Sequence, residues 1–245
     1  MNRNKLLIIA FLLFFVIIGI VFFLTETSKI KTVHPNLIAW YKFDEGKGTK
    51  VRDYSGYRND GAIYGGASWV KDTPFGTGYA LYFNGIDAMV QIPDNPILNN
   101  LEEITVTVWI KAEDLQYGAS IVDKGWYNPR IWYDSPFNRF MFQLRDIQEE
   151  RGFGWSDDSF SKCYKKWCFL AATYSSSENK VRLYINGELD KEFEWNGKPL
   201  VSRAGESLKI GFQDKYFKGI ISDLRIYNKA LSNQEILNVM RGQII

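Results

Sequence analysis

The clearest pattern in the chain is an apolar–polar alternation with a period of two residues between positions 167 and 195. Residues 181–185 alternate as a strand with one buried face does, and the return segment 188–195 also keeps one face apolar. Asn186-Gly187 joins them, and both residues tolerate the positive φ of a type I′ hairpin turn. The preceding segment, 167–174, is almost continuously apolar, which suits the middle of a sheet. These patterns predict three adjacent antiparallel strands.

Similar patterns predict further strands at 37–43, 78–87, 89–93, 104–112, 208–212 and 219–227. Residues 44–61 between the first two are rich in turn-forming residues and predict a long loop. Near the end of the chain, Ser232 and Glu235 have the spacing of a capping box, and the apolar residues that follow predict a short helix ending at Gly242. An all-β fold with a short C-terminal helix is therefore expected.

The N-terminus carries a different signal, an uninterrupted apolar run from Leu6 to Leu24 preceded by Arg3 and Lys5. Nineteen residues match the roughly 20 needed to cross a bilayer as a helix and exceed the apolar core of a signal peptide. The run has no polar face, which argues against a buried core helix, and residues 25–27 make a poor cleavage site. An uncleaved signal anchor is favoured over a cleaved signal peptide.

This anchor defines four parts of the chain. Residues 1–5 are a cytoplasmic tail, 6–24 a transmembrane signal anchor, 25–35 a linker and 36–245 a β domain. The basic residues before the anchor favour a cytoplasmic N-terminus, although Lys29 and Lys31 beyond it weaken the charge asymmetry. The expected localisation is a single-pass protein of the cell membrane, with the β domain outside the cell.

The amino-acid composition excludes several classes of function. Aromatic residues make up 16% of the chain and apolar residues 46%, enough for a large sandwich core. The net charge of +2 falls to near zero once Arg3 and Lys5 are set aside, so there is no electrostatic case for nucleic acid as a partner. His34, just before the domain, is the only histidine, which excludes Ser-His-Asp and His-based zinc sites within the fold.

The two cysteines, Cys163 and Cys168, are separated by four residues. An extended chain would hold them about 16 Å apart, so a disulfide requires a turn at residues 164–166. An oxidising exterior favours such a bridge. A buried free pair is the alternative.

The order of these segments resembles the laminin-G-like jelly-roll domains of the concanavalin A-like lectin/glucanase superfamily. The matching pieces cover about residues 36–245: AWYKFDEG at 39–46, DYSG at 53–56, NDG at 59–61, ALYFNG at 80–85, ITVTVWIK at 104–111, LYINGE at 183–188, GIISDLRIY at 219–227 and KALS at 229–232. The resemblance implies two packed, curved antiparallel sheets in a jelly-roll sandwich with one concave face. It also implies a non-catalytic module that binds glycans or other surface ligands, in many cases with one structural calcium.

A calcium ion takes six to eight oxygen ligands, often carboxylates together with backbone carbonyls of turns. Asp53, Asn59, Asp87 and Asp223 lie in the segments that the family uses for its ion, with Asp44 as a weaker fifth candidate. The alternative is that Asp53 and Asn59 only cap turns. Asp223 lies in an apolar strand and needs a cation, an arginine such as Arg225, or hydrogen bonds.

A candidate ligand site lies between residues 125 and 145, where aromatic residues alternate with amides and arginines. Stacking aromatics beside hydrogen-bonding groups suit the C–H faces and hydroxyls of sugars. Most of these aromatics are expected to fill the core. Trp126, Tyr127 and Arg130, beside Pro129 in a predicted loop, are the residues expected to be exposed and to bind the ligand.

Glu188, Asp190 and Glu192 imitate the Glu-x-Asp-x-Glu strand of the superfamily's endoglucanases. On a regular strand all three carboxylates would share one face. Residues four apart have Cα atoms about 13 Å apart, whereas retaining hydrolysis needs carboxyl groups about 5–5.5 Å apart. A glycoside hydrolase that uses Glu188 and Glu192 is therefore the less favoured hypothesis.

The sequence thus favours a non-catalytic, membrane-anchored extracellular module that recognises carbohydrate or a glycosylated surface, with a structural calcium. The alternatives are the glycoside hydrolase and a purely structural protein of an envelope or filament.

Overall fold

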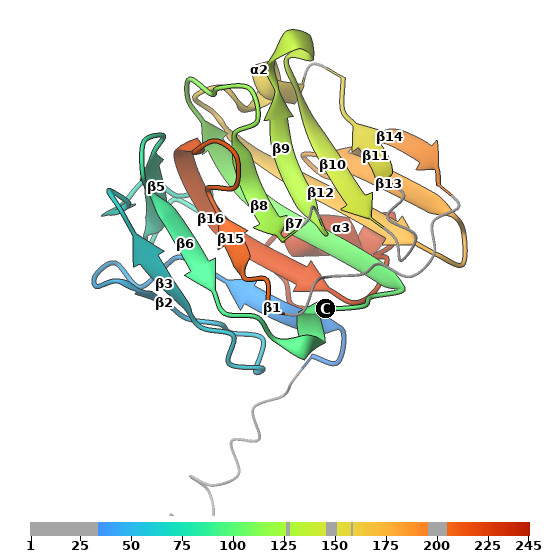
Figure 1. The fold of residues 1–245 in the computed structure, drawn as a ribbon, viewed down its shortest axis with the longest axis horizontal. Helices are drawn as coiled ribbons and strands as arrows, with labels where there is room; N and C mark the ends of the chain where they lie inside the picture. Colours follow the sequence, from blue (N-terminus) through green and yellow to red (C-terminus); the bar gives the residue numbers. More distant parts are fainter. Residues whose placement is uncertain (1–33, 126–127, 146–150, 158, 196–204) are drawn as a thin grey trace, which may run out of the picture. The chain divides into compact units, whose positions relative to one another are not determined.

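The computed structural model, which describes residues 34–125, 128–145, 151–157, 159–195 and 205–245, contains two antiparallel sheets that face each other (Figure 1). Sheet A has the strand order β14-β13-β12-β7-β16-β5-β4, and β1 pairs with β16 off this path. Its strands are β1 (Leu37–Tyr41), β4 (Ser68–Val70), β5 (Ala80–Asn84), β7 (Glu103–Ala112), β12 (Trp167–Ser175), β13 (Lys180–Ile185), β14 (Glu188–Glu194) and β16 (Lys218–Tyr227).

Sheet B has the order β11-β10-β9-β8-β15-β6-β3-β2. Its strands are β2 (Lys50–Val51), β3 (Gly61–Tyr64), β6 (Met89–Ile92), β8 (Ser120–Lys124), β9 (Arg130–Asp134), β10 (Arg139–Arg145), β11 (Arg151–Trp155) and β15 (Leu208–Ile210). The helical elements among the described residues are η1 (Pro96–Leu98), η2 (Ser135–Phe137), α2 (Ser159–Cys163) and α3 (Asn233–Met240). The predicted two-sheet antiparallel sandwich with a short C-terminal helix is confirmed.

The predicted hairpin forms β13 and β14. Asn186 and Gly187 have φ values of 52° and 82°, the left-handed pair that a type I′ turn requires. The apolar strand β12 lies inside sheet A, between β7 and β13, and eight of its nine residues are buried.

The main core lies between the sheets and draws apolar residues from both. Along β12, Cys168, Leu170 and Ala172 belong to this core, whereas Phe169 and Ala171 belong to a second cluster. This period of two shows that the second cluster lies on the outer face of sheet A.

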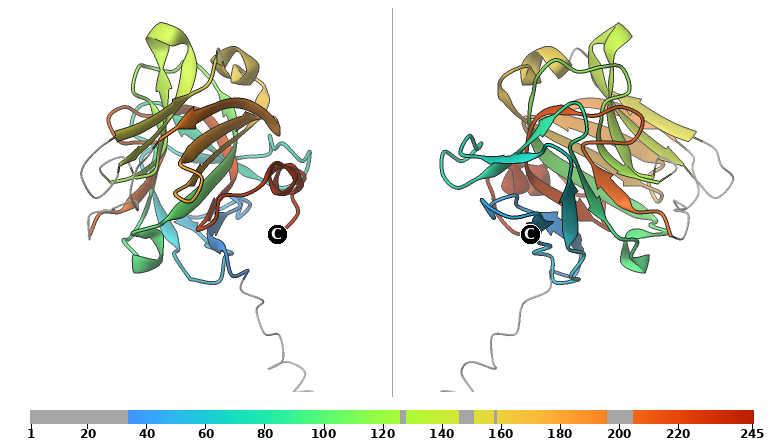
Figure 2. Two further views of the ribbon diagram at one scale, coloured as in Figure 1. Left: turned by 90° about the vertical axis from the view of Figure 1, so that its right-hand side faces the viewer. Right: turned by 60° about the vertical axis from the view of Figure 1, so that its left-hand side comes forward.

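Helix α3 covers that second cluster with Ile236 and Val239, which pack with residues of β1, β12, β13 and β16 (Figure 2). The predicted capping box is confirmed, because the Ser232 side chain accepts from the Glu235 backbone N–H while the Glu235 carboxylate accepts from the Ser232 backbone N–H. The chain leaves the helix at Gly242, whose φ of 80° suits glycine.

Cys163 and Cys168 form a disulfide, so the bridged alternative is the correct one. Helix α2 ends at Cys163 and β12 begins at Trp167, and Lys165 at φ 54° makes the turn that brings the two cysteines together.

The predicted tail, anchor and most of the linker lie outside the described residues. Within the described part of the chain, no helix is long and apolar enough to cross a membrane.

Candidate functional site

An aromatic pair, with one ring exposed and the other half-buried, lies at one end of sheet B. Tyr117, in the β7–β8 loop, is 57% exposed, and its ring stands edge-on to that of Trp132 on β9, with centroids 5.6 Å apart. The Arg130 guanidinium lies 5.2 Å from the centroid of the Trp132 ring. Together with Asp214 and Phe212 of the β15–β16 loop, described below, these residues are called the Tyr117 platform.

Arg130 is held from three sides. Its Nε lies 3.2 Å from Asp123 Oδ2 of β8, its Nη2 lies 2.8 Å from Asp214 Oδ2, and both nitrogens donate to the Ser120 hydroxyl. Nη2 also donates to the Gly118 carbonyl oxygen. The expectation that Arg130 is exposed is wrong: it begins β9 and is only 4% exposed, because its neighbours enclose it. Arg130 therefore positions the platform from beneath.

Asp123 lies at the bottom of this network and is fully buried. Burial raises the pKa of its carboxyl to about 7 and outweighs the attraction of the Arg130 guanidinium, which lowers the pKa; the nearby Asp214 raises it further. Neither carboxylate oxygen has a hydrogen-bond partner among the described residues. The charge on Asp123 is therefore sensitive to pH near neutrality.

The β15–β16 loop forms the other side of the platform. The backbone of Lys215 forms an isolated parallel β-bridge with that of Ala119 in the β7–β8 loop, so the two loops lie side by side. The rings of Phe212 and Tyr216 stack with centroids 4.3 Å apart, and Lys209 Nζ lies 5.7 Å from the centroid of the Phe212 ring. The two loops thus bring together the exposed Tyr117 ring, the half-buried rings of Phe212 and Tyr216, and the charged side chains of Asp214 and Lys215.

Of the three predicted ligand-binding residues, only Arg130 is described; Trp126 and Tyr127 lie outside the described residues. The core interpretation of the other aromatics holds for Tyr133, Phe140 and Phe142, which are buried between the sheets. Asn128 is also buried, and its amide exchanges hydrogen bonds with the backbone of Arg145.

The four predicted calcium ligands do not form one site. Asp53 caps the loop that follows β1: it accepts from the backbone N–H groups of Trp40, Ser55 and Asn59 at 2.8–3.0 Å. The Asn59 side chain donates to the Ile38 carbonyl oxygen and accepts from Asn95. These contacts are the ones that the turn-capping interpretation predicts for this loop.

The other two predicted ligands also have protein partners. Asp87 lies in the β5–β6 turn, where it accepts from the Gly66 N–H and the Asn84 amide, and these bonds lower its pKa. Asp223 is paired with Arg225. Among the described residues there is no group of three or more His, Cys, Asp or Glu side chains that could hold a metal ion. The three aspartates of the predicted set therefore do not form one such group, and calcium binding stays a prediction.

The predicted catalytic carboxylates do not share a face, because a β-bulge interrupts β14. Glu188 pairs with Ile185, a core residue, whereas Glu192 pairs with Arg182 on the outer face, and the register shifts between them at Asp190. The expectation that the three acids lie on one face is therefore wrong. Hydrogen bonds from Lys180 and Arg182 hold the pKa of Glu192 below its usual value, which is unsuited to a general acid.

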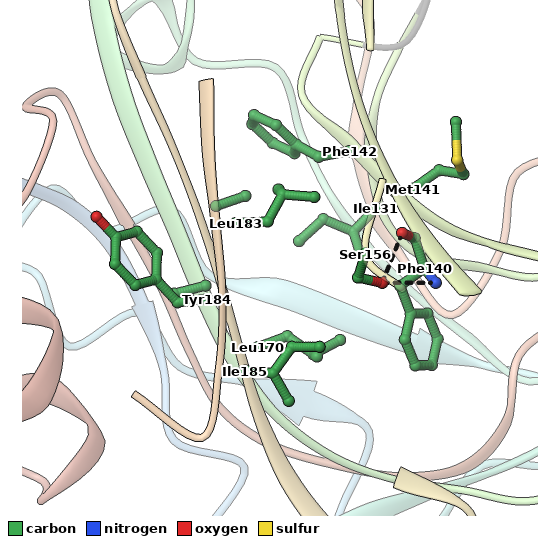
Figure 3. A pocket seen from close by; sticks show the side chains of 11 residues that line it. Ile131, Phe140, Met141, Phe142, Ser156, Leu170, Leu183, Tyr184 and Ile185 are labelled. Carbon is green, nitrogen blue, oxygen red and sulfur yellow. Dashed lines mark hydrogen bonds between the residues drawn. The ribbon is translucent and has the colours of Figure 1, made fainter. Parts of the chain in front are cut away.

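A void of about 20 Å³ lies inside the sandwich, between β9–β10 and β12–β13 (Figure 3). Ile131, Leu183 and other apolar side chains line it, and Tyr184 points away from it. The Ser156 hydroxyl is already hydrogen bonded to the backbone N–H and carbonyl of Phe140. The void has room for about one water molecule and few free polar partners, so it is a packing gap of the core.

Sequence reasoning missed Tyr117, Asp123 and Asp214. Tyr117 interrupts a polar loop in the sequence DLQYGAS at 114–120, and this is the one local signal that could have been noticed. Asp123 and Asp214 reach Arg130 from β8 and from a loop more than 80 residues further along the chain, and no spacing rule connects them.

The sandwich and its loop-borne aromatic platform define a lectin-like jelly roll. The family model described as the concanavalin A-like lectin/glucanases superfamily matches residues 83–237, and the chain belongs to this family. The predicted resemblance is confirmed. No curated protein matches the chain.

Several solved binding domains share the fold. The chain is similar to the binding domain of Paraclostridial Mosquitocidal Protein 1, with a TM-score of 0.68 and 16% identity over 84% of this chain and 52% of that one. It is also similar to domain 4 of AbnA, a GH43 extracellular arabinanase from Geobacillus stearothermophilus, solved with arabinotriose, with a TM-score of 0.64 and 22% identity over 84% and 98% of the two chains. For the binding domain of botulinum neurotoxin DC in complex with SialylT, the TM-score is 0.65 with 18% identity over 86% and 52%.

These similarities show the fold. The chain spans about half the length of the toxin binding domains and nearly all of the arabinanase domain. These similar structures are mostly binding domains.

Proposed function

We propose that this chain is a non-catalytic carbohydrate-binding module whose ligand rests on the Tyr117 platform. The observation that carries the proposal is the exposed Tyr117 ring beside Trp132, with charged groups fixed around it. A sugar ring can stack its C–H face on Tyr117, while its hydroxyls reach the half-exposed Asp214 carboxylate.

The charge on the platform favours a neutral sugar. The guanidinium beside the two rings, that of Arg130, is already paired with the carboxyl groups of Asp123 and Asp214, so it is not available to an anionic sugar. Two of the similar structures were solved with sugars, the arabinanase domain with arabinotriose and a neurotoxin binding domain with SialylT, which supports a carbohydrate ligand.

The proposal extends to location. The apolar run from Leu6 to Leu24 would hold the β domain outside the cell as a single-pass membrane protein, with residues 25–35 as the tether. The proposal includes no calcium ion, because the predicted ligands are satisfied by protein groups.

A glycan array of the full chain in mild detergent, followed by calorimetric titration of the strongest hit, tests the function. Tyr117→Ala is expected to weaken binding at least about five-fold, which corresponds to roughly 1 kcal/mol of lost stacking. Because Tyr117 is exposed, the substitution should leave the fold intact. Tyr64→Ala, which removes another half-exposed tyrosine on β3, is the matched control and should leave affinity unchanged.

Two results would contradict the proposal. One is an array on which no sugar binds while the chain co-purifies with a protein partner, as expected for the structural alternative. The other is an equal loss of affinity in the Tyr117 and Tyr64 variants.

A further inference from the structure

A second hollow, separate from the Tyr117 platform, lies on the sheet A side of the domain. It has a volume of about 530 Å³, within the range of small-molecule sites. Its walls come from β1 and the residues directly after it, from β16, from the β4–β5 loop and from the residues after α3, and they include Trp40, Lys42, Phe75, Asp223, Arg225 and Ile244. We call it the Lys42 hollow.

The floor of the hollow is a closed polar network. The Trp40 indole N–H donates to Asp223 Oδ1 at 2.6 Å, and Arg225 donates from Nε and Nη2 to the two oxygens of the same carboxylate at 2.9 and 2.8 Å. The guanidinium lies 4.6 Å from the centroid of the Trp40 ring and also donates to the Gln243 carbonyl oxygen. Asp223 and Arg225 neutralise each other, so this floor has no net charge.

Lys42 lies beside this network, and its ammonium group takes no part in the network's hydrogen bonds. Its Nζ lies 4.7 Å from the centroid of the Trp40 ring and 4.3 Å from that of Tyr54, and it forms no ion pair with any residue that the structure describes. The two rings hold the ammonium group in place by cation–π attraction. They supply no hydrogen-bond acceptor, so its N–H groups remain free for a ligand.

The surroundings of Lys42 favour an anion. The one unpaired carboxylate of the lining is Asp44, whose Oδ1 accepts the Tyr54 hydroxyl at 3.3 Å. Lys47 and Arg52 line a neighbouring groove that shares Asp44 with the hollow and also contains Glu45, and Lys71 Nζ lies 5.9 Å from the centroid of the Tyr79 ring. None of these three cations forms an ion pair with another described residue. Together with Lys42 they outnumber Asp44 and Glu45, the carboxylates of the hollow and the groove that have no ion pair among the described residues.

The rim of the hollow favours a ring over a bare inorganic anion. Phe75 and Ile244 are 47% and 46% exposed, although both are large apolar side chains. Two residues with hydroxyl groups, Thr77 and Ser222, also line the hollow. Apolar surface beside hydroxyl groups and one fixed ammonium is complementary to a sugar ring that carries a carboxylate.

We infer that the Lys42 hollow is a second binding site, specific for an acidic sugar, with the sugar carboxylate on Lys42 and its C–H face against Phe75. The site shares no residue with the Tyr117 platform and takes a different class of ligand, so the inference stands independently of the proposed function.

The test is calorimetric titration of the full chain with trigalacturonate and with its methyl ester, which keeps the shape but removes the charges. The acid is expected to bind about ten-fold or more tightly than the ester, the factor expected for a charge-assisted hydrogen bond. Lys42→Met removes the ammonium but keeps an apolar stem against Trp40, and should reduce the affinity for the acid to that for the ester. Phe75→Ser should weaken both ligands.

Two controls locate the site. Lys166→Met removes an exposed lysine near the disulfide and should change nothing. Tyr117→Ala should also leave trigalacturonate binding unchanged, whatever its effect on neutral sugars. Equal affinities for acid and ester, equal effects of the Lys42 and Lys166 variants, loss of trigalacturonate binding in Tyr117→Ala, or equally tight binding of inorganic phosphate would each overturn the inference.

Discussion

Asp223→Asn is expected to lower the free energy of unfolding by about 3–5 kcal/mol, because it leaves a buried guanidinium without its anion. Arg225 is 1% exposed, and Asp223 supplies both of its charge-assisted hydrogen bonds on one side as well as the acceptor for the Trp40 indole. Asparagine tolerates the left-handed backbone at this position, where φ is 45°, so the substitution tests the charge and not the backbone. Urea unfolding at neutral pH, followed by tryptophan fluorescence, measures the loss.

Asp157→Asn is the matched control, because Asp157 pairs with Lys191 in an ion pair that is largely exposed. Exposed pairs contribute at most about 1 kcal/mol. The double variant Asp223→Asn, Arg225→Met removes both buried charges and should be closer to the wild type than Asp223→Asn alone. If Asp223→Asn costs no more than Asp157→Asn, the closed network under the Lys42 hollow is not as described.

The second large effect is on the pH dependence of stability, through Asp123. Burial raises the pKa of this carboxyl from 3.8 to about 7 in the folded protein. Between these values the folded state binds more protons than the unfolded state, so stability falls as the pH rises. The stability that the folded protein has while Asp123 is protonated is present in full below pH 4 and is lost as the pH rises through about 7. The pKa shift corresponds to a loss on the order of 4 kcal/mol in the free energy of unfolding.

Asp123→Asn should abolish this slope. The difference in unfolding free energy between variant and wild type is expected to move in favour of the variant by a few kcal/mol between pH 4 and pH 8, because asparagine does not titrate. Subtracting the two curves removes the contributions of Arg130, Lys209, Glu206 and Asp214, the other charged groups around this position. Asp214→Asn, at the half-exposed partner of Arg130, should keep most of the slope. Parallel curves for the wild type and Asp123→Asn would contradict the buried position of Asp123.

Much of the fold could be predicted from sequence because its signals are local. The Asn186-Gly187 turn, the alternation along β7 and β13 and the capping box at Ser232 each depend on neighbours within a few residues, and the structure confirms each of them. The bulge at Asp190 could not be predicted, because the alternation of β14 is compatible with a regular strand. That one extra residue is enough to separate Glu188 from Glu192.

The candidate sites were harder to predict because they depend on distant segments. The sequence predicted an exposed Arg130 from its neighbour Pro129, whereas Asp214 and Asp123 enclose it from two other parts of the fold. Trp40 on β1 and Lys42 directly after the strand are only two residues apart, but the other residues of the hollow, such as Arg225 and Phe75, come from β16 and the β4–β5 loop. The rival prediction that Arg225 would pair with Asp223 is confirmed. This pairing could be predicted because the two residues are only two positions apart on one strand.

Hydrogen exchange of the full chain, with and without a saturating concentration of the sugar that binds best on the array, tests the central claim most directly. If the module holds carbohydrate on the Tyr117 platform, the sugar will slow exchange of the backbone amides at 116–120 and 211–217, the two loops that carry the exposed aromatic surface. Unchanged exchange in both loops, with protection confined to another part of the sandwich, would contradict the account.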